Sequence, residues 1–171
     1  MIEQVVETLT KIKEEDLDKF AQVLFTSKSN RIFLIGNGGS ASTASHFASD
    51  LLSLNFNATC LSDNISRVTA IANDYGWNDI FIKQLQHIKK GDVLIAISVH
   101  GGYLDWSNNL VKATMFAKGR VAKTLSLVGN DGGELAQICD FSIIVPSDST
   151  PIIEGLHSVL THIICEKVKQ K

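Results

Sequence analysis

The chain has 171 residues, of which 44% are hydrophobic and 20% charged, and this length and composition fit one folded domain and exclude a disordered chain. Sixteen Lys and Arg against eighteen Asp and Glu leave a net charge of −2, so no nucleic acid is indicated as a partner. Charges are scattered through residues 1–20 and no apolar stretch is long enough to span a bilayer, so we expect neither a signal peptide nor a membrane partner. The widely spaced Cys60, Cys139 and Cys165 are typical of buried free thiols in a reducing cytoplasm.

Five short apolar runs predict β-strands. Each is apolar throughout rather than alternating, as expected for strands that are covered on both faces. Segments with helical spacing lie between them, among them residues 40–52 and residues 105–118, the latter entered through Asp105 as a possible N-cap. This alternation predicts an α/β fold, a three-layer α/β/α sandwich around a parallel sheet. The predicted strands are residues 31–35, 58–61, 93–97, 124–128 and 141–145.

Two long amphipathic helices are predicted at the ends of the chain, over residues 2–26 and 149–169. The second begins in Ser-Thr-Pro, a cap followed by proline in the first turn. The apolar face of the first helix needs a partner, which is either its own sheet or another subunit. We therefore expect a single domain over residues 1–171, with residues 31–169 as its core and residues 1–28 as a helix that contributes to an interface.

Two loops that follow predicted strands combine glycines with hydroxyl-bearing side chains. Residues 36–41 read Gly-Asn-Gly-Gly-Ser-Ala, and residues 98–103 read Ser-Val-His-Gly-Gly-Tyr. Glycine lets the backbone approach a ligand closely, and the helix that follows presents unpaired N–H groups to an anion. Because ligands of open parallel sheets bind at the carboxyl ends of the strands, two such loops predict one phosphorylated small molecule between them.

Plainer interpretations of these loops stay open. Each can be a tight turn that needs glycine for its backbone conformation. The first loop also fits the dinucleotide pattern G-x-G-x-x-G/A, but the acidic residue that would hold a ribose, Asp63, stands 27 positions beyond Gly36 instead of about 20. The Gly-Asn-Asp-Gly-Gly stretch at residues 129–133 is interpreted as a structural turn.

Titratable side chains gather on two of the predicted helices. His46 and Asp50 are four residues apart and share a helix face, while the C-terminal helix carries Glu154, His157 and His162. Such groups serve as general acid and base, or they bind a divalent metal such as Zn²⁺. The alternatives are a solvated surface pair for His46 and Asp50 and a structural role for His157. The spacing alone does not show that the two helices meet.

Four stretches together resemble the SIS (sugar isomerase) domain of phosphoheptose isomerases, a motif shared with the DnaA initiator-associating proteins. They are residues 35–51, 72–76, 129–133 and 154–162, in one collinear register within residues 31–166. The resemblance implies a five-stranded parallel, flavodoxin-like sheet in a homotetramer, with active sites between subunits. It also implies isomerisation of sedoheptulose 7-phosphate to D-glycero-D-manno-heptose 7-phosphate through an enediol, a step toward lipopolysaccharide core or surface-layer glycans.

The resemblance also implies roles for individual residues. The catalytic base falls on Asp50 and the acid on His162. The positions that hold zinc in some family members fall on His46, Asp50, Glu154 and His162. The substrate-binding positions fall on Asn37, Gly38, Gly39, Ser40, Asp74, Ser98, His100, Tyr103 and Glu154.

Three departures from the family pattern are visible. Asp50 is one methylene shorter than the usual Glu, and Glu154 stands where well-studied isomerases have Gln. The phosphate loop keeps only Ser98, because His100 and Tyr103 replace its other two hydroxyl residues. A second hypothesis therefore stays open, a non-catalytic SIS regulator or scaffold that binds a phosphosugar.

Overall fold

The computed structural model describes residues 1–102 and 106–171, and its centre is a five-stranded sheet in the order β2-β1-β3-β4-β5. All neighbouring strands pair in parallel; Leu34 of β1, for example, is the register partner of Cys60 on one side and of Ile95 on the other. This is the flavodoxin-like order, and its topological switch point lies between β1 and β3. The strands are β1 (Arg31–Gly36), β2 (Asn57–Cys60), β3 (Val93–Ser98), β4 (Lys123–Gly129) and β5 (Phe141–Val145).

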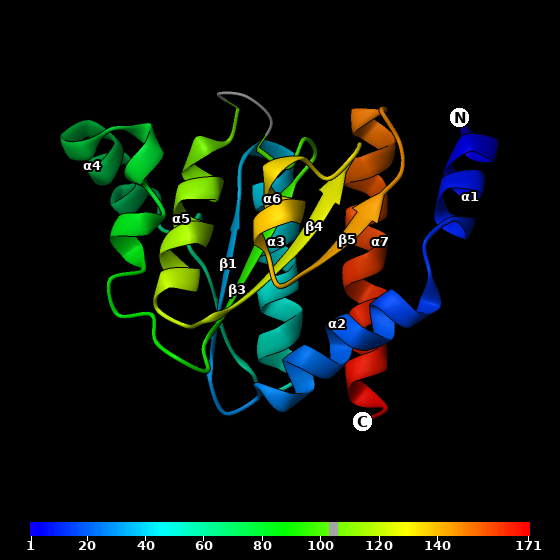
Figure 1. Ribbon diagram of the computed structural model, residues 1–171, viewed down its shortest axis with the longest axis horizontal. Coiled ribbons are helices and arrows are strands. Elements are labelled where there is room, and N and C mark those ends of the chain that lie inside the picture. The colour runs from blue at the N-terminus through cyan, green and yellow to red at the C-terminus, as the bar shows by residue number, and fades with distance from the viewer. Residues whose placement is uncertain (103–105) are drawn as a thin grey trace.

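Helices cover both faces of the sheet and enclose two hydrophobic cores (Figure 1). On one face lie α2 (Glu14–Thr26), α3 (Gly38–Ser53) and α7 (Thr150–Lys169). On the other lie α4 (Ile65–Tyr75), α5 (Asn108–Gly119), α6 (Gly133–Ile138) and the 3-10 turns Trp77–Asp79 and Ile82–Gln84. The structure thus confirms the three-layer α/β/α sandwich, and all five predicted strands are present to within one residue at either end.

The prediction of one continuous helix over residues 2–26 is wrong. The segment forms α1 (Ile2–Thr10) and α2, separated by Lys11–Lys13, and Lys13 has an extended backbone with φ −79° and ψ 128°. The three acidic residues Glu14, Glu15 and Asp16 fill the first turn of α2, where they favour the start of a new helix. Ile2 and Val6 of α1 are exposed, while Val5 and Leu9 pack partly against the core.

The other predicted helices shift only at their ends. The segment predicted at residues 105–118 begins instead at Asn108, with Ser107 at the N-cap position, and Asp105 lies outside the described residues. The three cysteines are free and buried, as predicted, and burial raises the pKa of Cys60 and Cys139 to about 11 and that of Cys165 to about 12. Within the described part of the chain, no helix is both long and apolar enough to cross a bilayer.

Candidate active site

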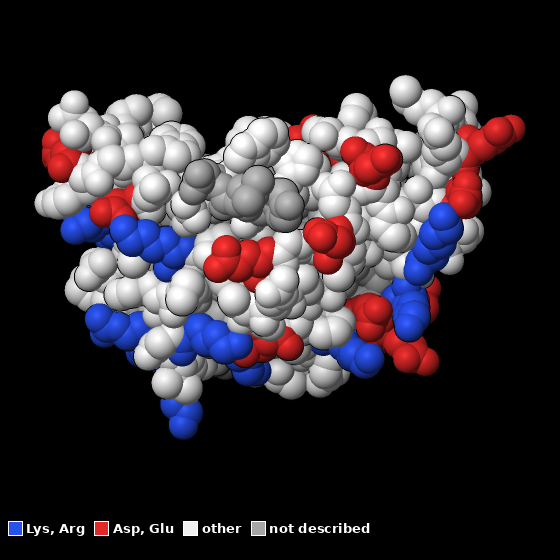
Figure 2. All heavy atoms as spheres, turned by 45° about the horizontal axis from the view of Figure 1, so that its top comes forward, with Lys and Arg blue, Asp and Glu red and all other residues white. Residues whose placement is uncertain are grey.

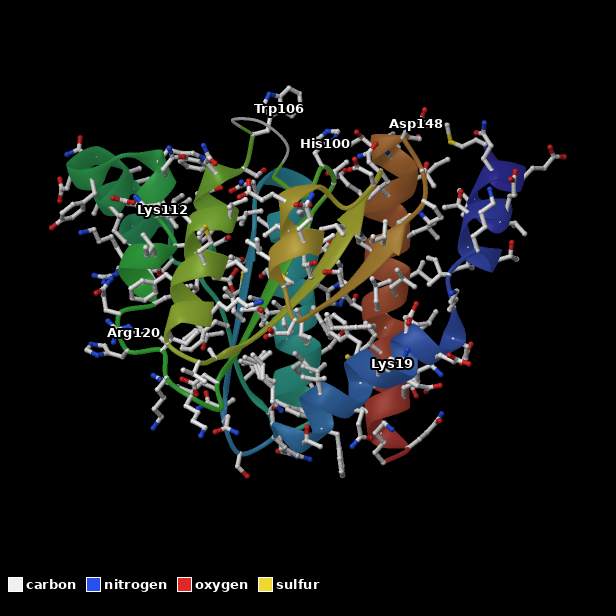
Figure 3. The ribbon with its side chains drawn as sticks, in the orientation of Figure 1. Lys19, His100, Trp106, Lys112, Arg120 and Asp148 are labelled. Atoms are coloured by element: carbon white, nitrogen blue, oxygen red, sulfur yellow. The ribbon has the colours of Figure 1, made fainter. Side chains whose placement is uncertain are left out.

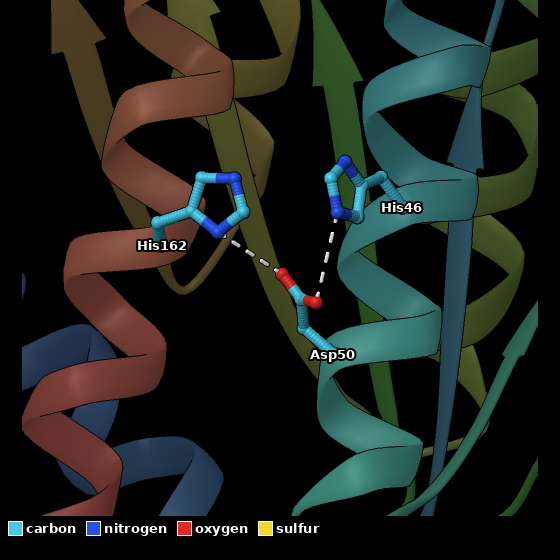
Figure 4. Close-up of side chains that lie close together, drawn as sticks. All are labelled: His46, Asp50 and His162. Atoms are coloured by element: carbon cyan, nitrogen blue, oxygen red, sulfur yellow. Dashed lines mark ion pairs between the residues drawn. The ribbon is translucent and has the colours of Figure 1, made fainter.

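Helices α3 and α7 bring three titratable side chains together on one face of the sandwich (Figure 4). His46 and Asp50 lie one turn apart on α3, and His162 reaches them from α7. Asp50 Oδ1 is 3.7 Å from His46 Nε2, and Asp50 Oδ2 is 3.2 Å from His162 Nδ1. The two imidazole rings meet edge to face with their centroids 5.0 Å apart. We call these three residues the acid–base cluster.

The Asp50 carboxylate is the least exposed group of the acid–base cluster. Its side chain is 28% exposed, against 59% for His46 and 53% for His162. Oδ2 is itself buried, and its close approach to His162 is not aligned as a hydrogen bond, so this oxygen has no donor among the described residues. A buried carboxylate oxygen without a donor is costly, and a proton or a cation satisfies it.

The acid–base cluster also has the donor set of a metal centre. One ligand atom from each residue, two imidazole nitrogens and a carboxylate oxygen, lies within 4.8 Å of the others. Nitrogen and oxygen ligands of this kind suit Zn²⁺, and the donor-free Oδ2 of Asp50 offers a lone pair to it. The residues present therefore fit the metal that the resemblance implies.

Glu154 lies elsewhere. It precedes His162 by eight residues on α7, which separates their backbones by about 12 Å along the helix axis. Its carboxylate packs against Gly39 so closely that a Cβ on Gly39 would overlap it. Of the four metal positions implied by the resemblance, the structure brings three together and places Glu154 at the amino end of α3.

A polar pocket of about 260 Å³ lies at the carboxyl ends of β1 and β3, and we call it the phosphate pocket. It collects seven of the predicted substrate residues, Glu154 among them, from three segments that are far apart in the sequence. Two further hydroxyl residues, Ser107 and Thr150, complete the wall, and the sequence analysis missed both. Its lining is Asn37, Gly38, Gly39, Ser40, Ile97, Ser98, Val99, His100, Ser107, Thr150 and Glu154.

Local hydrogen bonds hold the shape of the phosphate pocket. The amides of Asn37 and Asn109 bond to each other in both directions, at 2.9 Å each, which joins the start of α3 to the start of α5. Ser98 Oγ accepts a hydrogen bond from the backbone N–H of Gly101 at 3.1 Å. Gly38 opens α3 with φ +54°, a left-handed conformation that glycine adopts without strain.

Charge around the phosphate pocket is acidic rather than basic. Among the described residues that line it, none is Lys or Arg, and Glu154 is the one carboxylate. In Figure 2, where the carboxyl ends of the strands come toward the viewer, Lys and Arg side chains lie toward the sides and lower edge of the face. A bound anion would therefore be held by N–H groups, hydroxyls and the N-terminal ends of α3 and α5.

The remaining candidates are spread over the molecule. Asp74 is exposed near the end of α4 and accepts a hydrogen bond from Asn73, and no contact with the acid–base cluster or the phosphate pocket is found for it in the described ranges. Tyr103 lies outside the described residues. His157 is buried in α7 as a core histidine, but neither ring nitrogen finds a hydrogen-bond partner there, and burial lowers its pKa to about 4.

Comparison with known proteins identifies the family of the chain. The family model described as the SIS domain matches residues 1–129, and the chain belongs to the SIS domain family. The chain is 40% identical over 166 residues to a phosphoheptose isomerase of Helicobacter pylori, covering 92% of this chain and 84% of that one. It is 36% identical over 174 residues to one from Aliarcobacter butzleri, covering 96% and 88%. Within the SIS family the chain is thus a member of the phosphoheptose isomerase group.

Solved structures show the same relationship. The phosphoheptose isomerase GmhA from Neisseria gonorrhoeae superposes with a TM-score of 0.92 at 31% identity, covering 99% of this chain and 95% of that chain. A phosphoheptose isomerase from Francisella tularensis gives 0.90 at 27% identity, covering 99% and 93%. The resemblance seen in the sequence is thereby confirmed at the level of family and fold.

Proposed function

We propose that this protein is a phosphosugar aldose–ketose isomerase that converts sedoheptulose 7-phosphate to D-glycero-D-manno-heptose 7-phosphate. The observation that carries the proposal is the acid–base cluster, in which the Asp50 carboxylate lies between two imidazoles and its buried oxygen Oδ2 has no donor, in a chain 40% identical to a phosphoheptose isomerase. The product would feed the heptose units of lipopolysaccharide or surface glycans.

The reaction needs a base and an acid side by side. A proton leaves C1 of the ketose, the C2 oxygen gains one, and the enediol then takes a proton at C2 while the C1 hydroxyl loses one. Asp50 is the proposed base, because its Oδ2 is free to accept a proton, and His162, 3.2 Å away, is the proposed acid. Their closeness lets both act on adjacent carbons of one substrate.

The phosphate pocket is the proposed anchor for the other end of the substrate. Ser40, Ser98, His100 and Ser107 surround it, and the starts of α3 and α5 add the favourable ends of two helix dipoles. Glu154 of this pocket and His162 of the acid–base cluster stand about 12 Å apart along α7. That separation favours an elongated substrate such as a seven-carbon sugar phosphate. Asp74 and Tyr103 stay proposed sugar and phosphate contacts on the strength of the resemblance.

Zn²⁺ is the proposed cofactor. His46, Asp50 and His162 would hold it, and Glu154 would join them only through a change in its side-chain position. A bound Zn²⁺ supplies Lewis-acid polarisation of a carbonyl or hydroxyl oxygen.

A homotetramer with the active sites between subunits is part of the proposal. Ile2 and Val6 of α1 are 82% and 55% exposed, and an apolar face of this kind is suited to burial against another copy of the chain. His46 and His162 are each more than half exposed in the single chain, so a neighbouring subunit has room to enclose the acid–base cluster. We place the protein in the cytoplasm, as the reducing environment predicted from its free cysteines implies.

The test is turnover. Purified protein is incubated with sedoheptulose 7-phosphate, with added Zn²⁺ or with EDTA, and formation of the aldoheptose phosphate is followed. We expect Asp50→Asn to lower kcat by roughly 100- to 10,000-fold, the usual contribution of a general base. Asp16→Asn, the same change at a surface ion pair, is the matched control and keeps full activity.

Two outcomes would contradict the proposal. Undiminished turnover by Asp50→Asn would remove Asp50 as the base. Absence of product from the unmodified protein, with the sugar phosphate still protecting it against thermal unfolding, would support the non-catalytic binding protein instead. A loss of activity in EDTA that Zn²⁺ restores would establish the cofactor.

A further inference from the structure

We propose that Asn130 is a positioning residue, which fixes the tautomer of His100 so that His100 presents an N–H donor to the substrate phosphate. The inference rests on the proposed function, because it assigns a ligand to the phosphate pocket. It gives a role to a residue in the 129–133 stretch, which the residue pattern alone predicts to be a structural turn.

The position of Asn130 is fixed by its own hydrogen bonds. It directly follows β4 in the left-handed conformation, with φ 54°, and its backbone N–H donates to the carbonyl of Ser147 at 3.1 Å. Its side-chain Nδ2 donates to the carbonyl of Val99 at 3.1 Å. A carbonyl only accepts, so the amide nitrogen, and not the amide oxygen, faces Val99.

That orientation determines what His100 meets. The same Nδ2 lies 3.2 Å from His100 Nδ1. An amide nitrogen only donates, so the contact is a hydrogen bond only when Nδ1 accepts. The proton of the neutral ring is then on Nε2. The Asn130 amide therefore selects one of the two tautomers of His100, in the way that a partner on one ring nitrogen sets the state of the other.

The selected tautomer matters because His100 lines two hollows. It lines the phosphate pocket together with Ser98 and Ser107, and it also lines a wider hollow on the side of Asn130 and Ser147. Asn130 lines only the second hollow, so Nδ1 is engaged on that side. His100 packs edge to face on Trp106 with centroids 5.2 Å apart, and Figure 3 shows both side chains at the carboxyl edge of the sheet.

Phosphate oxygens accept hydrogen bonds, so an Nε2–H group attracts them and a bare Nε2 lone pair repels them. The family pattern has a hydroxyl at this position, and a hydroxyl rotates to suit its ligand. This chain has an imidazole, and the ring nitrogen that carries its proton must be fixed before the phosphate binds. Since Lys and Arg are absent from the described lining of the phosphate pocket, each neutral donor carries a larger share of the binding. Asn130 is the residue that keeps this proton on Nε2 of His100.

The variant Asn130→Gly tests the proposal. Glycine keeps the left-handed backbone without strain and removes the amide. We expect KM for sedoheptulose 7-phosphate, and the dissociation constant of inorganic phosphate measured by calorimetry, to rise roughly tenfold, the effect of losing a hydrogen bond to a charged group. We expect kcat to stay within about twofold, since the acid–base cluster is untouched. Nitrogen NMR of labelled histidine should show Nε2–H for His100 in the unmodified protein and a tautomer mixture in the variant.

A double-mutant cycle separates positioning from a structural role. In a His100→Ser background the pocket again has a hydroxyl, and Asn130→Gly should then leave KM and phosphate affinity unchanged. An equal loss in both backgrounds would show that Asn130 only shapes the turn and would overturn the proposal. So would a His100 resonance with its proton on Nδ1 in the unmodified protein. The NMR and phosphate measurements need no turnover, so their outcome is independent of whether the protein is an isomerase.

Discussion

The acid–base cluster and the phosphate pocket differ in what they are made of. The cluster consists of three titratable side chains on the outer surfaces of two helices, with both histidines more than half exposed. The pocket is lined mainly by hydroxyls, an amide and backbone at the ends of strands, together with His100 and Glu154, and Ser40 and Ser98 in it are buried. Proton transfer depends on the identity of a few groups, whereas anion binding depends on the shape of the backbone.

The difference explains where the chain departs from its family pattern. In the cluster the substitution is conservative, a carboxylate for a longer carboxylate at Asp50. In the pocket a hydroxyl position carries the imidazole of His100, because any donor at the right place on the same backbone can serve. Changes to the cluster should therefore affect kcat, and changes to the pocket should affect binding or folding.

The largest expected effect is on the cluster. His162→Gln removes the proposed acid while keeping a polar side chain of similar reach, and we expect kcat to fall about 1,000-fold with KM within a few fold. Steady-state kinetics checks this, with His87→Gln, at an exposed histidine remote from the cluster, as the control. A rise in KM at unchanged kcat would assign His162 to binding and would remove the contrast drawn between the two regions.

The next effect concerns the backbone beneath the pocket. Gly101 has φ +62°, and a Cβ there would overlap the carbonyl oxygen of Gly132, which is a backbone atom and not the end of a flexible side chain. We expect Gly101→Ala to lower the free energy of unfolding by about 3 kcal/mol, from strain and overlap together. Urea unfolding measures this. Gly119→Ala, at the end of α5 with nothing within 4 Å of the added carbon, should instead change stability by at most about 1 kcal/mol. An equal change in unfolding free energy for the two variants would show that the loop at Gly101 accommodates the added carbon with little strain.

The features that could be predicted from the sequence are those that short stretches of consecutive residues determine. The strands were predictable because runs of consecutive apolar residues, such as residues 93–97, are buried on both faces and end at glycine or polar residues. The two loops were predictable because parallel strands carry their ligand sites at their carboxyl ends. The pair of His46 and Asp50 followed from helical spacing, but that His162 would meet it came only from the resemblance.

What escaped prediction depends on packing at a distance. Glu154 and His162 lie on the same helix. The side chain of Glu154 nevertheless packs against Gly39, because the start of α3 lies beside it. Ser107 enters the pocket because α5 begins at Asn108, three residues later than predicted. The break at residues 11–13 is marked in the sequence by the three acidic residues that follow it, but the apolar period runs through it without interruption and predicts one helix.

The last effect appears only in acid and concerns His157, which lies on α7 between the two regions. The side chain is 1% exposed, neither ring nitrogen has a hydrogen-bond partner in the described structure, and burial lowers its pKa from 6.5 to about 4. The unfolded chain takes up a proton at this residue as the pH falls below about 6.5, and the folded protein does so only near pH 4. Lowering the pH across this window therefore favours unfolding, with a loss of up to about 3 kcal/mol that is absent above pH 6.5.

The variant His157→Leu should flatten the dependence of unfolding free energy on pH between 4 and 6.5, whatever it does to stability at pH 7. Urea unfolding at a series of pH values measures the slope, and His87→Gln, at an exposed histidine, should leave it unchanged. The same slope in His157→Leu and the unmodified protein would assign the acid sensitivity to other groups.

Because α7 carries Glu154 of the phosphate pocket on one side of His157 and His162 of the acid–base cluster on the other, unfolding driven by this one buried imidazole would remove proton transfer and phosphate binding together. A pH profile in which binding and kcat fail at different values would show instead that the two regions respond to acid separately.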